Sequence, residues 1–231
     1  MSDLEPGSGL SFPSFHERAE QMSQLDLARV ELTNQMRDLI RDAFITKAGL
    51  EAVQKATDLV ALALEQVRSN QRKPGEAESQ MIFLDRSPLM GVMNSLSMPL
   101  VMNIEGTGEN RSIVGRAVFT EPYEGPPGHV HGGYVAAGFD EVLGMAQSLS
   151  GRPGLTGELS VTYRRPTPLF VELVFRGVVT EIVGRKIFTR GTLHHGDILC
   201  AESTGLFLSM KPEVMGRLFR DHQHGALNDP Q

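Results

Sequence analysis

The sequence predicts an α+β fold in which an antiparallel β-sheet curls around one central helix, preceded by an N-terminal helical extension. Three observations support this prediction. Residues 14–72 contain almost no glycine or proline and repeat apolar side chains at helical spacing. After Pro74 the chain changes to short β-branched runs separated by turn residues. Between the second and third runs, residues 134–149 are apolar or small on nearly every side, which predicts a buried helix.

Composition and charge limit the classes of protein that the chain can belong to. With 231 residues, 40% hydrophobic and 22% charged, the chain is typical of a globular protein. Its net charge of −6 argues against nucleic acid and anionic membranes as partners. We found neither a signal-peptide pattern nor an apolar run of about 18 residues. The single cysteine, Cys200, excludes an intrachain disulfide, so we expect a cytoplasmic protein.

Residues 1–75 are predicted to form an arm followed by two helices. Ser14 and Glu17 have the spacing of a capping box, which predicts the start of a long helix, and Gly49 separates it from a second helix that ends before Lys73. We interpret the pair as a helical hairpin that covers a sheet or extends a dimer interface. A nucleic-acid-reading helix-turn-helix would carry a basic excess, and residues 14–72 are mixed in charge.

Residues 76–215 are predicted to form the main domain, with a C-terminal tail at 216–231. Strands 96–105 and 112–120 should pair as a hairpin, because glycines and an asparagine lie between them. A loop rich in glycine and proline precedes the helix at 134–149. Four further strands are expected at 158–165, 170–183, 186–194 and 198–210.

Asp140 is a charged residue in a helix that is predicted to be buried on nearly every side. Its neighbours at helical spacing are small or apolar, and an unpaired buried carboxylate costs several kcal/mol. We therefore expect a partner outside the helix. Glu141 points about 100° away from Asp140 and is interpreted as structural, with a catalytic role as base as the alternative.

The start of the same helix has the features of an oxyanion site. His131-Gly132-Gly133 precede Tyr134, and no Ser, Thr, Asp or Asn stands in the capping position. We therefore expect the first N–H groups to face a ligand, with the positive end of the helix dipole behind them. Donors of this kind stabilise negative charge that develops on a carbonyl oxygen.

These residues resemble a known family. His131-Gly132-Gly133 followed by Asp140 is similar to the H-G-G-x6-D signature of the hotdog-fold acyl-CoA thioesterases of the phenylacetate-pathway (PaaI-like) and human thioesterase-superfamily type. The resemblance covers roughly residues 98–210. It implies a sheet wrapped around a helix, subunits that pair into a continuous sheet, and active sites between subunits. The first ninety-odd residues lie outside it.

Carried over to this chain, the resemblance implies an acyl-CoA thioesterase in which Asp140 is the catalytic carboxylate. Gly133 and Tyr134 would donate backbone N–H groups to the thioester oxygen, and His131 would shape the helix entrance and contact the thioester. Asp140 would activate water as a general base or attack directly to form an anhydride. The substrate would be an acyl-CoA and the protein a homodimer or homotetramer, with no cofactor other than the coenzyme A of the substrate.

The charge distribution suggests where coenzyme A binds. Residues 151–194 hold seven basic and three acidic side chains, so this part of the sheet is locally basic. Arg164 and Arg165, at the end of the predicted strand 158–165, are candidates for the phosphates. A solvent-exposed sheet face without a ligand is the alternative.

Other candidate chemistries are weaker. The seven histidines include His129-x-His131, His194-His195 and His222-x-His224, but no cysteine pairs or H-E-x-x-H spacing accompany them, so we expect no metal. Cys200 lies in an apolar strand and is interpreted as a core residue rather than a nucleophile.

Three other functions remain as alternatives. A hotdog hydratase would need a hydratase segment with Asp and His together, which we do not find. An acyl-CoA-sensing repressor would need a basic helical head. A non-catalytic protein would bind acyl-CoA without releasing its thiol.

Overall fold

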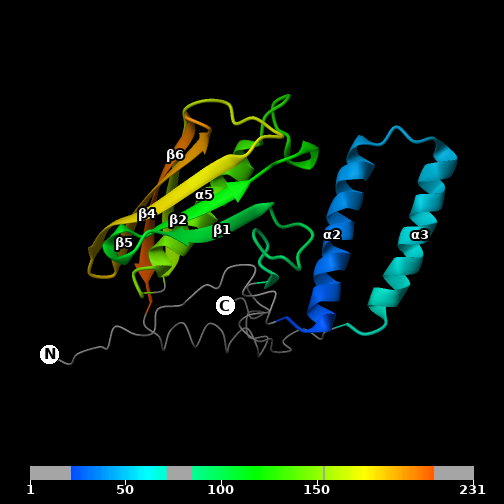
Figure 1. Ribbon diagram of the computed structural model, residues 1–231, viewed down its shortest axis with the longest axis horizontal. Helices are drawn as coiled ribbons and strands as arrows, with labels where there is room; N and C mark the ends of the chain where they lie inside the picture. Colours follow the sequence, from blue (N-terminus) through cyan, green and yellow to red (C-terminus); the bar gives the residue numbers. More distant parts are fainter. Residues whose placement is uncertain (1–21, 72–84, 153, 211–231) are drawn as a thin grey trace, which may run out of the picture.

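A six-stranded antiparallel sheet packs against one long helix, α5, and a helical hairpin, α2 and α3, lies outside the sheet (Figure 1). The computed structural model describes residues 22–71, 85–152 and 154–210. The helices are α2 (Gln24–Ile45), α3 (Leu50–Arg68) and α5 (Gly132–Ser148). The strands are β1 (Leu100–Glu105), β2 (Ser112–Ala117), β3 (Gly154–Tyr163), β4 (Leu173–Val183), β5 (Lys186–His195) and β6 (Ile198–Ser209).

The order of the strands is β1-β2-β4-β5-β6-β3, so β1 and β3 form the two edges. The predicted hairpin of β1 and β2 is confirmed, and the tight turns at Gly184 and Gly196, both with positive φ, join β4, β5 and β6 into a meander. Strand β3 follows α5 in sequence but pairs with β6 alone. The helix therefore crosses from one side of the sheet to the other.

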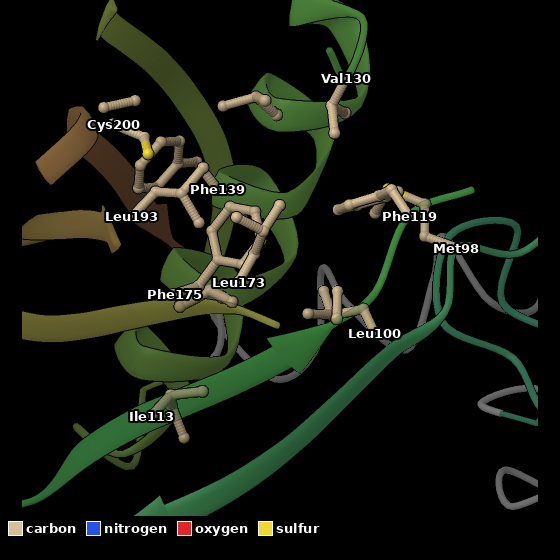
Figure 2. Packing of buried hydrophobic residues seen from close by; sticks show 14 of the residues in the cluster. Met98, Leu100, Ile113, Phe119, Val130, Phe139, Leu173, Phe175, Leu193 and Cys200 are labelled. Carbon is tan, nitrogen blue, oxygen red and sulfur yellow. The ribbon is translucent and has the colours of Figure 1, made fainter. Parts of the chain in front are cut away.

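The hydrophobic core lies between α5 and the sheet. Val135, Phe139, Val142 and Ala146 recur at three- and four-residue spacing and are buried. Phe139 meets Phe175 of β4 edge to face, with ring centroids 5.3 Å apart. Figure 2 shows these rings between the helix and the strands. This packing confirms the prediction of a sheet around a central helix.

The start of the first helix differs from the prediction. Helix α2 begins at Gln24 rather than continuing unbroken from Ser14, because Ser23 is extended and its hydroxyl caps the Asp26 N–H. Residues 1–21 are outside the described ranges, so the Ser14–Glu17 capping box stays a prediction. The domain boundary at 75/76 and the tail at 216–231 also lie outside the described residues.

The hairpin is attached to the main domain through a half-buried arginine of α2. The Arg37 guanidinium donates to the carbonyl oxygens of Gly91 and Asn94 and to the Ser97 hydroxyl, at 2.6–3.0 Å. Helix α3 has no buried residue. The hairpin thus leaves apolar side chains of both helices exposed, including Leu39, Phe44, Leu50, Leu59 and Leu62. None of the described helices is long and apolar enough to cross a membrane.

We predict opposite effects of alanine at two glycines of α5. A Cβ at Gly138 would lie 2.6 Å from Cζ of Phe175, so Gly138→Ala overpacks the core and lowers the free energy of unfolding by about 1–2 kcal/mol. At Gly144 the nearest atom is 3.9 Å from the added Cβ, so Gly144→Ala gains helix propensity and raises it by about 0.5–1 kcal/mol. Urea unfolding measures both. Equal effects of the two substitutions would contradict this account of the packing.

Candidate active site

Asp140 lies on the side of α5 that faces the edge strand β3. The hydroxyl of Thr156 donates a hydrogen bond of 2.9 Å to Oδ1 of Asp140. The Asp140 side chain is half-buried, so it is not sealed in the core. The expectation of a partner outside the helix is confirmed, and the partner is Thr156.

The sequence analysis missed Thr156 because the strand was predicted to begin only at Glu158. In the structure β3 begins at Gly154, and the register with β6 shifts between Thr156 and Glu158. The β-bulge at this point interrupts the alternation of side chains that a sequence pattern relies on. The Gly-Leu-Thr-Gly run carried no recognisable signal for a partner of Asp140.

The start of α5 differs from the expectation of unoccupied N–H groups. His131 is the N-cap, and its Nδ1 accepts the Gly133 N–H at 3.0 Å. The Tyr134 N–H donates to the carbonyl oxygen of His131 at 2.9 Å. The His131 ring takes the capping role that Ser, Thr, Asp or Asn usually fills. The expectation that these N–H groups have no partner within the protein is therefore wrong. Because the His131 ring is exposed, a ligand oxygen can take its place at Gly133.

The helix start opens onto a cavity of about 930 Å³. The lining residues come from the loop before α5, from its first turn and from the segment after β3: Pro126, His129, Val130, His131, Gly132, Gly133, Val135, Tyr163, Arg164, Arg165, Pro166 and Thr167. The structure thus brings His131 and Gly133 together with Arg164 and Arg165 in the lining of one cavity. Neither Asp140, two turns further along the helix, nor Tyr134 is among the lining residues.

The two arginines differ in their ion pairs. Arg164 pairs with Glu202 at 2.8 Å, and Arg190 pairs with the same carboxylate at 3.2 Å. These bonds lower the pKa of Glu202 and keep it charged. Arg165 makes no ion pair with any residue that the structure describes. Arg165 is therefore the cation of this cavity whose charge is not already neutralised.

Tyr163, the last residue of β3, forms a hydrogen bond to Gly132, the first residue of α5. Its hydroxyl donates to the carbonyl oxygen of Gly132 at 2.8 Å. Together with Thr156 it gives β3 two side-chain hydrogen bonds to α5, one at each end of the candidate site. The edge strand therefore sets the position of the helix relative to the cavity.

Glu141 is half-buried, as Asp140 is, and makes no hydrogen bond with the described residues. Removal from water, with a smaller effect of the Asp140 charge, raises the pKa of Glu141 to about 7. A pKa near neutral pH suits a general base as well as a buried structural carboxyl group. The structural interpretation of Glu141 and its catalytic alternative therefore both stay predictions.

The remaining candidates have no catalytic setting. Cys200 is buried in the core, and its burial raises the pKa of the thiol, which disfavours the reactive thiolate. Within the described ranges, no three His, Cys, Asp or Glu side chains lie close enough together to hold a metal ion. His222 and His224 lie outside these ranges.

A sheet wrapped around one helix, with the helix start at a cavity, defines the hotdog class of proteins. Residues 127–202 match the family model described as thioesterase superfamily. A solved crystal structure of a thioesterase superfamily protein is 33% identical, has a TM-score of 0.67, and aligns over 78% of this chain and 90% of its own. The chain therefore belongs to the thioesterase superfamily. An alignment that covers 78% of this chain also extends into the N-terminal helical region.

Curated relatives resemble a smaller part of the chain. The acyl-coenzyme A thioesterase THEM4 of Mus musculus is 36% identical over 92 residues, which are 39% of this chain and 40% of the mouse protein. THEM4 of Xenopus laevis is 36% identical over 94 residues, or 42% of its length. The chain thus matches about two fifths of the length of these relatives.

We predict that Glu141→Gln stabilises the protein in a pH-dependent way. Between pH 4.5 and about 7 an unfolded chain releases the Glu141 proton while the folded chain retains it, so rising pH costs stability in this window. The Tm of the variant should exceed that of the wild type by a few degrees at pH 8 and match it at pH 4. Glu181→Gln, on an exposed residue of β4, is the control. The same gain at both pH values would show that ionisation is not the cause.

Proposed function

We propose that this protein is an acyl-CoA thioesterase, which hydrolyses an acyl-CoA to the free acid and coenzyme A. The observation that carries the proposal is the geometry of α5. One helix presents its first-turn N–H groups to a cavity lined by Arg165, and two turns later it presents a carboxylate held by Thr156. The acyl-coenzyme A thioesterase names of the curated relatives support the same substrate class.

The thioester carbonyl would bind at the amide of Gly133. In the structure this N–H donates to Nδ1 of His131, so the substrate oxygen would replace the imidazole as acceptor. As the carbonyl carbon becomes tetrahedral, its oxygen gains negative charge and the hydrogen bond strengthens. The Tyr134 amide is the second predicted donor. Because its N–H already donates to the His131 carbonyl oxygen, it would form a hydrogen bond to both this oxygen and the substrate oxygen.

Asp140 would supply the proton acceptor. Thr156 occupies Oδ1, so Oδ2 would accept a proton from a water molecule as the water oxygen attacks the carbonyl carbon. Because Asp140 does not line the cavity of its own chain, the carboxylate would come from a second copy, in a site between subunits as the family resemblance implies. The tetrahedral intermediate then collapses with cleavage of the C–S bond, and the thiolate of coenzyme A takes up the proton that Asp140 accepted. Direct attack by Asp140, with an anhydride that water opens afterwards, is the alternative course.

Coenzyme A would lie along the side of the cavity formed after β3. Arg165 is the principal candidate for a phosphate, since Arg164 already shares the Glu202 carboxylate with Arg190. The proposed reaction consumes only water and needs no cofactor beyond the coenzyme A of the substrate. A cytoplasmic location remains part of the proposal and is based on the lone cysteine.

Self-association of the chain is also part of the proposal. Among the described residues, strand β3 pairs with β6 alone, and Leu155 on this strand is 53% exposed. Residues 24–68 carry six basic and seven acidic side chains, a balance that suits contact with a second copy better than contact with a polyanion. We propose a homodimer through β3 or a dimer of dimers that also uses the hairpin.

Asp140→Asn is predicted to lower kcat by about 10²–10⁴-fold, because the amide still accepts from Thr156 but cannot take a proton. Thiol release from short, long and aromatic acyl-CoAs measures the effect, and Tm should change little. Asp197→Asn, in the turn between β5 and β6, is the matched control with unchanged turnover.

The alternatives make different predictions for the same assay. Wild-type turnover in Asp140→Asn would remove Asp140 from the mechanism. Saturable binding of acyl-CoA by the wild type, with no thiol released from any member of the panel, would favour a non-catalytic acyl-binding protein. Retardation of DNA by the protein at moderate salt would favour the repressor.

Light scattering coupled to size exclusion tests self-association. The expected mass of the wild type is two or four times the chain mass of 25.3 kDa. Leu155→Lys places a charge on the edge strand β3 and should reduce the mass, whereas Val101→Lys, on the equally exposed opposite edge strand β1, should not. A wild-type mass equal to that of one chain at micromolar concentration would overturn the proposed dimer.

A further inference from the structure

We propose that Tyr163 is a positioning residue that orients and strengthens the Gly133 N–H as a hydrogen-bond donor. The inference rests on the proposed function, in which this N–H receives the thioester oxygen. It assigns a task to a side chain that the mechanism above does not use. The basis is a chain of two hydrogen bonds that pass through a single peptide group.

The Gly132 carbonyl and the Gly133 N–H belong to the same peptide group, at the first bond of α5. The Tyr163 hydroxyl donates to the oxygen at one end of this group, at 2.8 Å. The nitrogen at the other end donates to Nδ1 of His131, at 3.0 Å. The peptide is therefore held from both ends, and the acceptor at its nitrogen is the one that a substrate oxygen would replace.

A hydrogen bond at the carbonyl acts on the N–H in two ways. Because the peptide group is planar, fixing the carbonyl direction also fixes the direction in which the N–H points. Donation to the oxygen also withdraws electron density from the nitrogen, and linked hydrogen bonds strengthen one another by about 10–30%. A preorganised donor needs less rearrangement as charge develops on the substrate oxygen.

The surroundings show how closely the tyrosine fits this peptide. A Cβ on Gly132 would lie 3.3 Å from the Tyr163 hydroxyl and 3.4 Å from its ring, so glycine lets the phenol approach the backbone. Tyr163 ends β3 opposite the buried Ala201, which anchors its backbone in the sheet. Tyr163 is 52% exposed and is one of the residues that line the cavity. The hydrogen bond of its hydroxyl therefore lies beside the proposed substrate site.

Tyr163→Phe retains the ring and removes only the hydroxyl. We expect kcat to fall about fivefold with KM within about twofold of the wild type, because the lost interaction acts in the transition state. Arg165→Gln should raise KM instead, since it is assigned to coenzyme A. The matched control is Tyr123→Phe, which removes a hydroxyl bond to the Ser97 carbonyl oxygen and should leave both constants unchanged.

A second measurement reads the peptide group directly and needs no activity. Gly132-Gly133 is the only pair of adjacent glycines in the chain. In protein labelled with glycine carrying carbonyl ¹³C and amide ¹⁵N, an HNCO spectrum therefore contains one cross-peak, from the Gly132 carbonyl and the Gly133 N–H. Tyr163→Phe should move its carbonyl carbon and its amide proton upfield, while Tyr123→Phe should leave the cross-peak in place.

The two measurements separate the possible failures. A cross-peak that does not move in Tyr163→Phe overturns the proposal, whatever the turnover does. A cross-peak that moves while an active enzyme keeps its kcat also overturns it, because the hydroxyl then has no effect on the reaction. If the wild type releases no thiol, the proposed function fails, and the cross-peak alone decides whether Tyr163 controls the Gly133 donor.

Discussion

The packing of α5 against the sheet is the constraint on which the rest of the structure depends. The helix lies against β2, β3, β4, β5 and β6, and its contact with β4 is so close that Gly138 leaves no space for a methyl group beside Phe175. This contact fixes the rotation of the helix about its axis. Once the apolar residues face the sheet, Asp140 must emerge on the β3 side, and Glu141 follows about 100° further round the helix.

Hydrophobic periodicity was sufficient to predict the helix, the strands and their antiparallel pairing, because each signal is local. The strand order was not predictable from these patterns. The pairing of β3 with β6 joins segments about forty residues apart, such as Ser160 with Thr204, and no turn specifies it. The first helix was predicted too long, since apolar spacing continues through Ser23, where a hydroxyl cap begins the helix instead.

The sequence allowed predictions about the site where the chemistry depends on residue type, but not where it depends on geometry. Asp140 could be identified as a misplaced carboxylate, and Arg165 as part of a basic segment. His131 acts as a cap because its ring turns back toward Gly133, a rotamer choice that sequence does not encode. Thr156 and Tyr163 reach α5 only because β3 lies beside it, so neither could be recognised before the strand was placed.

The position of β3 at the rim of the sheet has a consequence for dynamics. An outer strand is held along one side only, and such strands open more readily than interior ones in hydrogen exchange. This strand carries Thr156 and Tyr163, whose hydroxyl groups donate hydrogen bonds to α5. Fraying of one rim would thus disturb the proton acceptor and the amide donor simultaneously, so amide protection along β3 should report how much of the time the site is intact.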